Sequence, residues 1–450
     1  MSSFHGRELD VRAMLEAIGV KSEEELWAAV PESVRLKRPL DLPAPLSAVE
    51  LERELLRRAE TNRDLKHNLC FLGAGTYAHH VPALVPALLS RGEFLTAYTP
   101  YQAEVSQGTL QAMFEYQTLI AELTGLEVSN ASMYDGAEAA AEAVLMAARM
   151  RPKNGAGPVL LSAGLNPAYR RVIATYLAHS GRELKTIPLA ADGTTDLGRM
   201  KAEITGALCV VMQSPNFFGC VEDWTQVAAA VKDSGAVWIA AVAEALSLAL
   251  LKPPGHFGAD IVCGDGQSFG IPPAFGGPHL GFLAGREADV RRMPGRLVGE
   301  TVDHDGRRGF VLTLSTREQH IRREKATSNI CSNHGLMALA AAIYLAKLGG
   351  PGLFDLAKQN HDLAETLKRK LGMIGLKPRF PAPCFNEFTL ELKTDAAVAA
   401  EKIARQGILA GLPLGRHFPE FKSCLLVAAT EILNEADLDR LVSALAEVSK

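Results

Sequence analysis

A loop near residue 75 carries side chains that could bind a small molecule. The segment FLGAGTYAHHVPALV, residues 71–85, combines glycines with Thr76, Tyr77, His79 and His80. Glycine lets a backbone approach a ligand closely, and hydroxyl and imidazole groups can hydrogen-bond to one. The alternative is a polar turn before a helix. Adjacent histidines do not suit a metal pair, because successive side chains point in different directions, so we expect no metal site.

A second cluster lies in LTAYTPYQAEVSQGTLQ, residues 95–111. Tyr98, Tyr101 and Gln102 surround Pro100 just before a predicted helix. Polar and aromatic residues on loops are typical of pocket walls. The alternative is a tyrosine-rich loop that packs on the core with its hydroxyl groups hydrogen-bonded. The residues alone leave both interpretations open.

Two further segments place polar residues where α/β proteins bind ligands. Asp135-Gly136 begins an alanine-rich helix, and a helix N-terminus can bind an anion through its free N–H groups. Asp135 and Glu138 would repel a phosphate, so a capping role is favoured there. Asn216, in MQSPNFFGCVEDW, follows a predicted strand at a sheet edge where ligands bind. The alternative is an ordinary turn residue.

The segment STREQHIRREKATSNICSN, residues 315–333, is rich in charge. Its charges could bind an anion. The spacings of Arg317 to Lys325 and of Glu318 to Arg322 also suit ordinary ion pairs along a helix. A solvated or interface face is the favoured interpretation. The glycine-rich segment at 259–285 lacks the dinucleotide-binding fingerprint.

Short apolar segments alternate with helical ones through the middle of the chain. Buried strands are predicted at PVLLSAG, ELKTIPLA, ALCVVMQSP, AVWIAAVA, ADIVCGDG and LGFLAG. This alternation predicts an α/β fold with a parallel sheet covered on both faces. We expect a helical arm over residues 1–60, a large α/β domain over 61–330 and a small C-terminal α+β domain over 331–450. The small domain should contain strands at FNEFTLEL and SCLLVAAT.

Several helix boundaries are marked by their residues. A helix start is indicated at Ser22, where a serine precedes three acids. The amphipathic segment at 110–125 should end at Gly125. The apolar segment HGLMALAAAIYLAKLGG should end at its glycine pair, just before Pro351.

The composition excludes several classes of protein. The chain has 450 residues, of which 48% are hydrophobic, and a formal net charge of −4. These values exclude disorder as the main state, and they provide no basic field for nucleic acid or anionic lipid. No apolar stretch reaches the roughly 20 residues of a membrane span, and MSSFHGRELD is not a signal peptide. Seven scattered cysteines without a CxxC pair indicate a reducing compartment, so we expect a soluble cytoplasmic protein.

Together, these motifs resemble the glycine decarboxylase family, the P-protein of the glycine cleavage system. The resemblance covers nearly the whole chain, and the chain looks like the first, N-terminal-type subunit of P-proteins that are split between two chains. It rests on FLGAGTYAHHVPALV, TAYTPYQAEVSQGTLQAMFEYQTLIAELTGLEVSNASMYDGA, QSPNFFG, GDGQSFGIPPAFGGPHLGFLA and TREQHIRREKATSNIC.

The resemblance implies a fold of the aspartate-aminotransferase class (PLP fold type I). This fold has a mainly parallel seven-stranded sheet in a large domain and a smaller C-terminal domain. In the family, glycine forms an imine with pyridoxal phosphate and loses CO2, and the pyridine ring accepts the electrons. The aminomethyl carbon then passes to the lipoyl arm of the H-protein. The resemblance also implies a homologous second subunit, a heterotetramer and an active site near the subunit interface.

One group that such an enzyme needs is missing at the end of a predicted strand. An aspartate at this place keeps the pyridine nitrogen protonated in cofactor-binding relatives. The strand AVWIAAVA ends instead in Ala240, Ala241 and Val242, and the nearest acid is Glu244.

The Schiff-base lysine is also missing. Gln267 or Ser268 stands at its expected position, and no lysine lies between Lys252 and Lys325. We therefore expect a catalytically incomplete subunit whose lysine-bearing partner holds the pyridoxal phosphate.

The resemblance suggests what this chain contributes to the shared site. We expect non-covalent catalytic contributions from Tyr98, Tyr101 and Gln102. Possible further pocket residues are Thr76, Tyr77, His79, His80 and Asn216. Two alternatives remain open: an independent pyridoxal-phosphate lyase or transaminase that uses another lysine such as Lys252, and a structural subunit with a vestigial pocket.

Overall fold

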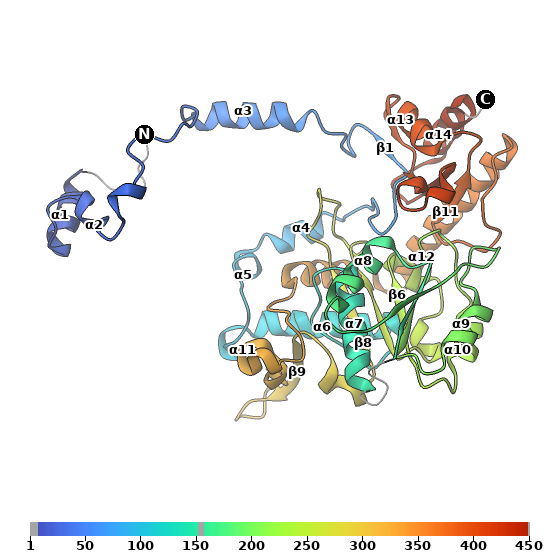
Figure 1. The fold of residues 1–450 in the computed structure, drawn as a ribbon, viewed down its shortest axis with the longest axis horizontal. Helices are drawn as coiled ribbons and strands as arrows, with labels where there is room; N and C mark the ends of the chain where they lie inside the picture. The colour runs from blue at the N-terminus through green and yellow to red at the C-terminus, as the bar shows by residue number, and fades with distance from the viewer. Residues whose placement is uncertain (1–7, 152–156, 449–450) are drawn as a thin grey trace. The chain divides into compact units, whose positions relative to one another are not determined.

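The computed structural model describes residues 8–151 and 157–448. The chain forms two compact units that divide between Arg63 and Asp64. The first unit contains helices alone, and every strand of the described residues belongs to the second (Figure 1).

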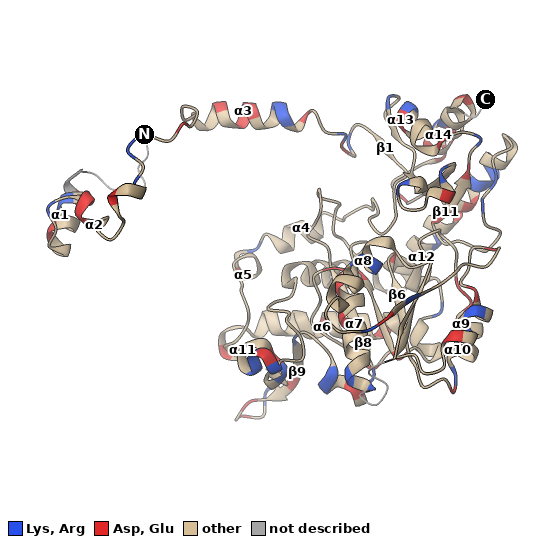
Figure 2. Ribbon diagram, in the orientation of Figure 1, with Lys and Arg blue, Asp and Glu red and all other residues tan. Residues whose placement is uncertain are grey.

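The first unit consists of short helices, which are α1 (Glu8–Ile18), α2 (Glu23–Leu26), the 3-10 helix η2 (Glu32–Val34) and α3 (Ala48–Ala59). The helix predicted to begin after Ser22 is one turn long, and the Ser22 side chain makes no capping bond. The serine that caps with its side chain is Ser47, which forms a capping box with Glu50 before α3. Figure 2 shows basic and acidic residues together along α3, where Glu54 pairs with Arg57.

A seven-stranded sheet lies at the centre of the second unit. Its strands are β2 (Val128–Ser129), β3 (Val159–Ser162), β4 (Leu184–Ile187), β5 (Cys209–Gln213), β6 (Val237–Val242), β7 (Ile261–Asp265) and β8 (Gly281–Gly285). They follow the order β2-β8-β7-β6-β5-β3-β4. Only β8 runs antiparallel to its neighbours. All six predicted strands are present, and the predicted mainly parallel sheet is confirmed.

The two faces of the sheet pack into separate hydrophobic layers, because successive side chains of a strand point to opposite faces. In β6, Trp238 and Ala240 belong to one layer, whereas Val237 and Ile239 belong to the other. The first layer also contains residues of α6 (Gln107–Thr124), α9 (Leu197–Glu203), α10 (Trp224–Val231) and α12 (Gly335–Met373). The second contains residues of α7 (Gly136–Met150) and α8 (Pro167–Leu177).

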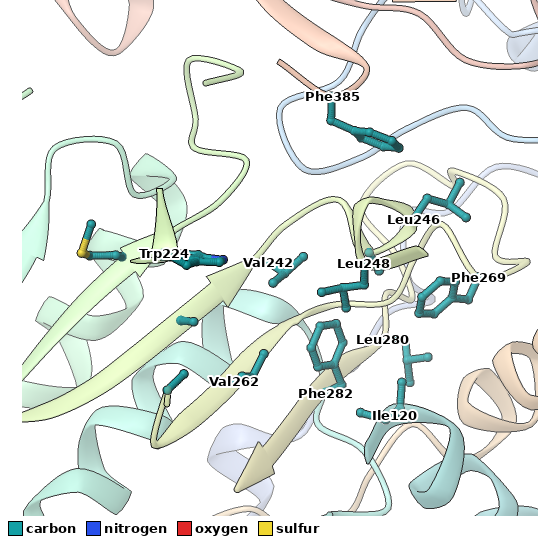
Figure 3. Packing of buried hydrophobic residues seen from close by; sticks show 14 of the residues in the cluster. Ile120, Trp224, Val242, Leu246, Leu248, Val262, Phe269, Leu280, Phe282 and Phe385 are labelled. Carbon is teal, nitrogen blue, oxygen red and sulfur yellow. The ribbon is translucent and has the colours of Figure 1, made fainter. Parts of the chain in front are cut away.

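The first layer is rich in large aromatic and aliphatic side chains (Figure 3). Phe269, Leu280 and Phe282 lie beside Ile120 of α6 there, and all four side chains are buried. Burying one such side chain stabilises a fold by about 1.5–3 kcal/mol. This packing holds the strand ends and the loops that follow them in place.

The predicted boundaries of two helices are confirmed. The helix α6 ends at Gly125, whose φ of 70° closes the helix in the left-handed conformation. The helix α7 begins after Asp135, whose side chain accepts a hydrogen bond from the N–H of Glu138. The capping interpretation of Asp135 therefore holds.

The C-terminal part builds a second, smaller sheet. It is antiparallel, with the order β11 (Glu387–Glu391), β14 (Cys424–Ala428) and β13 (Leu412–Pro413). The helices α13 (Ala396–Ala404) and α14 (Glu435–Val448) share its hydrophobic core. The short strand β1 (Leu69–Cys70) pairs with β12 (Ile408–Leu409), so the start of the second unit joins this C-terminal region.

The remaining elements are short. A hairpin is formed by β9 (Leu297–Val302) and β10 (Arg308–Thr313). The other helices are α4 (Leu84–Leu89), α5 (Gly92–Leu95) and α11 (Gln319–Arg322). The 3-10 helices are η3 (Ala103–Val105), η4 (Ala245–Ala249), η5 (Pro254–Phe257), η6 (Glu287–Arg292), η7 (Ser315–Arg317), η8 (Arg323–Lys325), η9 (Leu414–Arg416) and η10 (Pro419–Phe421).

The long segment α12 is interrupted where the sequence predicts a helix end. Gly349 has φ 62° and ψ 175°, so two helices meet at a kink just before Pro351. By length and composition, α12 is also the one helix in the described ranges that could cross a membrane. Ala338, Ala341 and Tyr344 are buried in the first hydrophobic layer, and α12 is therefore a core helix.

The close packing of β7 gives a test of the fold. A Cβ atom on Gly264 would lie 2.0 Å from the carbonyl oxygen of Val242 and 2.7 Å from Phe282. Gly264→Ala should therefore destabilise the fold by about 1–3 kcal/mol through overpacking, measured as a lower thermal unfolding midpoint. Gly108→Ala in α6 is the matched control, because nothing lies within 4 Å of its Cβ position. The control should stabilise slightly, and an equal loss in both variants would contradict this packing.

Candidate functional site

The loops after β3, β5 and β7 surround a cleft of about 420 Å³. Parallel α/β sheets bind ligands at this carboxyl edge of the strands. We call it the sheet-edge cleft, and its lining includes Gly75, Thr76, Tyr134, Asp135, Asn166, Tyr169, Arg171, Phe217, Asp265, Pro278, His279, His334 and His417. Of the residues predicted from the sequence, Thr76 lies in this wall.

The N-terminus of α7 reaches the cleft, and carboxylates of the chain already occupy two of its N–H groups, those of Gly136 and Glu138. Asp265 Oδ2 accepts a hydrogen bond from Gly136 N at 3.1 Å, and Asp135 Oδ1 accepts one from Glu138 N at 2.8 Å. Glu138 Oε2 accepts from Tyr134 N at 3.1 Å. Burial raises the pKa of Glu138 to about 8, so the negative charge at the helix start comes from Asp135 and Asp265.

Asp265, the last residue of β7, is the central acceptor of the cleft. Besides Gly136 N, it accepts from Gln267 N at 3.0 Å and contacts Nδ1 of His279 at 3.0 Å. This carboxylate raises the pKa of His279 above its ordinary value. The other imidazole nitrogen of His279 lies 3.4 Å from the hydroxyl of Thr76. The predicted loop at 71–85 is thereby connected to the end of β7.

The two residues at the expected lysine position are both buried. Gln267 accepts a hydrogen bond from Tyr77 N at 2.9 Å and donates to Tyr77 O at 3.0 Å and to Ile271 O at 2.6 Å. Its amide therefore clamps the loop at 71–85 onto the turn after β7. The Ser268 hydroxyl has no hydrogen-bond partner among the described groups.

The cleft does not fit pyridoxal phosphate, the cofactor that the resemblance implies. No lysine belongs to its described lining. The end of β6 presents Ala240, Ala241 and Val242, which are fully buried. Glu244 is committed elsewhere, because its oxygens bond Leu246 N and contact His79. A phosphate at α7 would meet Asp135 and Asp265 instead of free N–H groups.

His79 lies away from this cleft, between two buried carboxylates. Its Nδ1 is 2.8 Å from Glu431 and its Nε2 is 3.3 Å from Glu244, and its side chain is only 3% exposed. Burial opposes protonation, but the two carboxylates prevail and raise the pKa of His79 to about 9. Glu431 also accepts from His80 N at 2.7 Å and from Asn360 at 3.0 Å. The His80 side chain itself is exposed.

Tyr77 is buried beside another carboxylate of the C-terminal sheet. Its hydroxyl donates to Glu387 at 3.0 Å, and the backbone N–H of Ala74 donates to the same carboxylate at 2.6 Å. Burial raises the pKa of Glu387 to about 7. The predicted loop therefore holds the C-terminal region through two carboxylates, Glu387 and Glu431.

Tyr98, Tyr101 and Gln102 occupy an exposed loop. Tyr98 is 82% exposed and lines a second cleft of about 360 Å³, whose wall shares Pro278 and His334 with the sheet-edge cleft. Tyr101 is 57% exposed, and its ring lies 5.4 Å from that of His320. The loop is thus not packed on the core of this chain.

The side-chain amide of Asn216 makes its hydrogen bonds within and next to its own turn. Its amide donates to Gly193 O and Glu222, and its oxygen accepts from the N–H groups of Phe218 and Cys220. It does not belong to the lining of the sheet-edge cleft, whereas the next residue, Phe217, does. This geometry matches the turn interpretation.

The expectation of helical ion pairs over 315–333 was wrong. Three single turns, η7, α11 and η8, replace a continuous helix. Arg317 is buried and donates to the backbone carbonyls of Leu314, Met293 and Gly295. Leu314 and Arg323 both have positive φ values, which break helical geometry on either side of α11.

Several site residues escaped the sequence analysis. Asp265 and His279 lie within the segment at 259–285, where the sequence analysis considered the glycines and the lysine position but neither of these two residues. Asp265 could have been predicted as a site residue, because it is a polar residue at the end of a predicted strand, where α/β sheets bind ligands. Nothing local marked Glu387 or Glu431, which lie more than 300 residues along the chain from the loop that they bind.

Comparison with known proteins gives extensive matches. A family profile described as glycine cleavage system P-protein matches residues 3–445. A relative from Anaeromyxobacter dehalogenans (strain 2CP-C), named probable glycine dehydrogenase (decarboxylating) subunit 1, is 52% identical over 94% of this chain and 95% of its own. A relative of the same name from Rhodospirillum centenum (strain ATCC 51521 / SW) is 51% identical over 98% of both chains.

Solved structures agree with these matches. An inhibitor-bound glycine decarboxylase (P-protein) of the glycine cleavage system has a TM-score of 0.90 and 48% identity, with all of both chains covered. A sphingosine-1-phosphate lyase from Burkholderia pseudomallei K96243 has a TM-score of 0.66 at 18% identity, covering 94% of this chain and 93% of its own. The predicted aspartate-aminotransferase-class fold is confirmed.

The buried His79 gives a test by pH. Its pKa is about 9 in the folded chain against an ordinary 6.5. A pKa raised by folding stabilises the protein fully below the unfolded value, and this stabilisation is lost as the pH rises through the folded value. The stability advantage of the wild type over His79→Gln should shrink by about 2–3 kcal/mol between pH 6.5 and 9.5.

Denaturant unfolding at each pH measures this difference. His67→Gln is the control for replacing a histidine at the surface, because the His67 side chain is 79% exposed. A wild-type advantage over His79→Gln that stays constant up to pH 9.5 would show that His79 is not held charged.

Proposed function

This chain belongs to the glycine cleavage system P-protein family, and on that premise we propose that it acts as one half of a two-chain glycine decarboxylase. A homologous, lysine-bearing second subunit holds the pyridoxal phosphate. Together the two chains decarboxylate glycine and pass the aminomethyl group to the lipoyl arm of an H-protein. The active complex is a heterotetramer, and it resides in the cytoplasm.

The proposed division of roles between the two subunits rests mainly on the residues that this chain has in the sheet-edge cleft. Gln267 or Ser268 stands where the chain would need a lysine, and Gln267 is clamped to Tyr77. The strand end at Val242 provides no acid, and α7 begins with Asp135 and Asp265 where a phosphate would need free N–H groups. A chain with these three replacements needs a partner for the covalent chemistry.

The exposed loop before α6 supports a contribution of this chain to the partner's site. A tyrosine that packs on its own chain usually buries its ring and hydrogen-bonds its hydroxyl. Tyr98 and Tyr101 are instead 82% and 57% exposed. Tyr98 lines the second cleft together with His334, and the ring of Tyr101 contacts that of His320. We assign Tyr98, Tyr101 and Gln102 to the walls of the glycine pocket and of the lipoyl-arm channel, with no covalent role.

The exposed side chains of the helical first unit are further evidence for a partner chain. No described residue between 10 and 63 is buried, and Trp27, Leu51 and Leu55 are about half exposed or more. Apolar side chains at this density in a helical arm gain stability when a partner covers them. We propose that the arm packs on the lysine-bearing subunit.

The alternative of an independent enzyme that uses Lys252 has little support. Lys252 is exposed, and its ammonium group lies 4.9 Å from the centre of the Phe257 ring. It does not line the sheet-edge cleft. Borohydride reduction in the presence of pyridoxal phosphate and glycine tests this directly. We expect the reduced cofactor on a lysine of the partner, and no added mass on this chain, by intact-protein mass spectrometry.

A control for that experiment is Lys252→Ala, which should leave both the labelling pattern and the visible absorption of the complex unchanged. Cofactor attached to any lysine of this chain would overturn the proposed division. The chain purified alone should be colourless.

Tyr98→Phe and Tyr101→Phe test the pocket assignment in the reconstituted complex. Loss of one hydroxyl hydrogen bond worth about 1 kcal/mol should lower kcat/KM for glycine-dependent CO2 exchange by about fivefold in at least one variant. Tyr176→Phe on α8 is the matched control, since Tyr176 is also exposed, at 41%. Unchanged kcat and KM in both loop variants would favour a structural subunit with a vestigial pocket.

A further inference from the structure

Two cysteines face each other where the loop after β5 meets the entrance to β11. Cys220 and Cys384 are paired across an isolated antiparallel bridge. Beside them, Val221 N donates to Pro383 O at 2.8 Å. The hydrogen bond therefore flanks the cysteine pair instead of joining it, and Cys220 and Cys384 form a non-hydrogen-bonded pair.

This kind of pair brings side chains closest together. In antiparallel strands, the Cα atoms of a non-hydrogen-bonded pair lie about 4.5 Å apart, and both side chains stand on the same face. Disulfides form at Cα separations of about 4.4–6.8 Å. The backbone at Cys220 and Cys384 thus already meets the separation that a disulfide needs.

The surroundings of the two sulfur atoms differ. Cys384 Sγ lies 3.6 Å from the ammonium of Lys368 and 3.5 Å from Glu365. Cys220 Sγ lies 3.9 Å from the carbonyl oxygen of Asp192. Burial raises the pKa of Cys220 to about 12 and that of Cys384 to about 11. Both groups are thiols at neutral pH, so uncatalysed oxidation should be slow.

Cys384 is expected to be the first of the two to react, because the contact with Lys368 offsets part of the effect of burial and of Glu365, which raise its pKa. An adjacent ammonium favours the thiolate, which is the nucleophilic form of cysteine. The Lys368 side chain is 20% exposed, so this contact reaches solvent. The nearest charged groups to Cys220 are acidic, Glu222 and Asp192 among them, and they disfavour its thiolate.

We propose that Cys220 and Cys384 are a redox-modification site that closes to a disulfide when the chain meets a hydroperoxide. The Cys384 sulfur attacks a peroxide oxygen, the O–O bond breaks, and a sulfenic acid and an alcohol or water form. The Cys220 sulfur then attacks the Cys384 sulfur. An S–S bond forms, the S–O bond breaks, and the hydroxyl leaves with the Cys220 proton as water. The two thiols are oxidised by two electrons in total, and the hydroperoxide is reduced by two.

The disulfide would fasten the sheet-edge cleft to the C-terminal sheet. Phe217 in the cleft wall and Asn216 belong to the same turn as Cys220. Cys384 lies just before Phe385 and Glu387, and Glu387 binds the loop at 71–85. A covalent link at this point would restrict any relative movement of the two sheets. It would also cross-link the unfolded chain over a long loop, which stabilises the fold.

Peptide mapping of the full-length chain tests the proposal. The chain is treated with hydrogen peroxide at pH 8.5, denatured, alkylated and digested. We expect a Cys220–Cys384 linked peptide that disappears with dithiothreitol. The thermal unfolding midpoint should rise by several degrees after oxidation and return after reduction. Exposed Cys331 reports that the oxidant dose is sufficient.

Cys384→Ser should abolish both the linked peptide and the rise in the midpoint. Cys424→Ser is the matched control, because Cys424 is also buried in the C-terminal sheet, and it should retain both. Cys220→Ala serves as a second test if Cys384→Ser does not fold. Full alkylation of both Cys220 and Cys384 after prolonged treatment with excess hydroperoxide, well after Cys331 is fully oxidised, would overturn the proposal.

Discussion

The first turn of α7 is satisfied by carboxylates of its own chain, and the character of the sheet-edge cleft depends on this. A helix N-terminus carries unpaired N–H groups and partial positive charge, which makes it an anion site. Here Asp135 and Asp265 supply the acceptors from within. Asp265 then positions His279, which reaches Thr76. The network that would bind a phosphate elsewhere instead holds the loop at 71–85 in place.

A second network, which is buried, fastens the same loop to the C-terminal region. His79 lies between Glu244, which follows β6, and Glu431, which follows β14. Breaking a buried pair leaves an uncompensated charge, and this costs about 3–5 kcal/mol. The loop is therefore held from two sides, by Gln267 at its centre and by carboxylates at its end. The sequence of the loop at 71–85 is typical of a ligand-binding loop, but most of its polar residues bond to other segments of this chain.

The sheet could be predicted from the sequence, but these two hydrogen-bond networks could not. Strands β3 to β8 were predictable because each is a short apolar run between turns, and the ends of α6 and α7 because Gly125 and Asp135 act locally. The buried partners of Tyr77 and His79 come from more than 150 residues away, and no local pattern encodes such a contact. The suggested helical ion pairs within 315–333 are not formed, and spacing alone cannot reveal that Arg317 is buried among carbonyl groups.

Under the proposed division of roles, the polar groups at the sheet edge must find their partners inside this chain. A buried polar group without a partner costs about 1–3 kcal/mol. Gln267 provides two hydrogen bonds to Tyr77, and Asp265 provides one to Gly136. A phosphate group at the start of α7 would have to displace the carboxylate of Asp265 from Gly136 N. The exposed loop before α6 differs from these buried networks, because Tyr98 is 82% exposed and the ring of Tyr101 contacts His320 and Arg296.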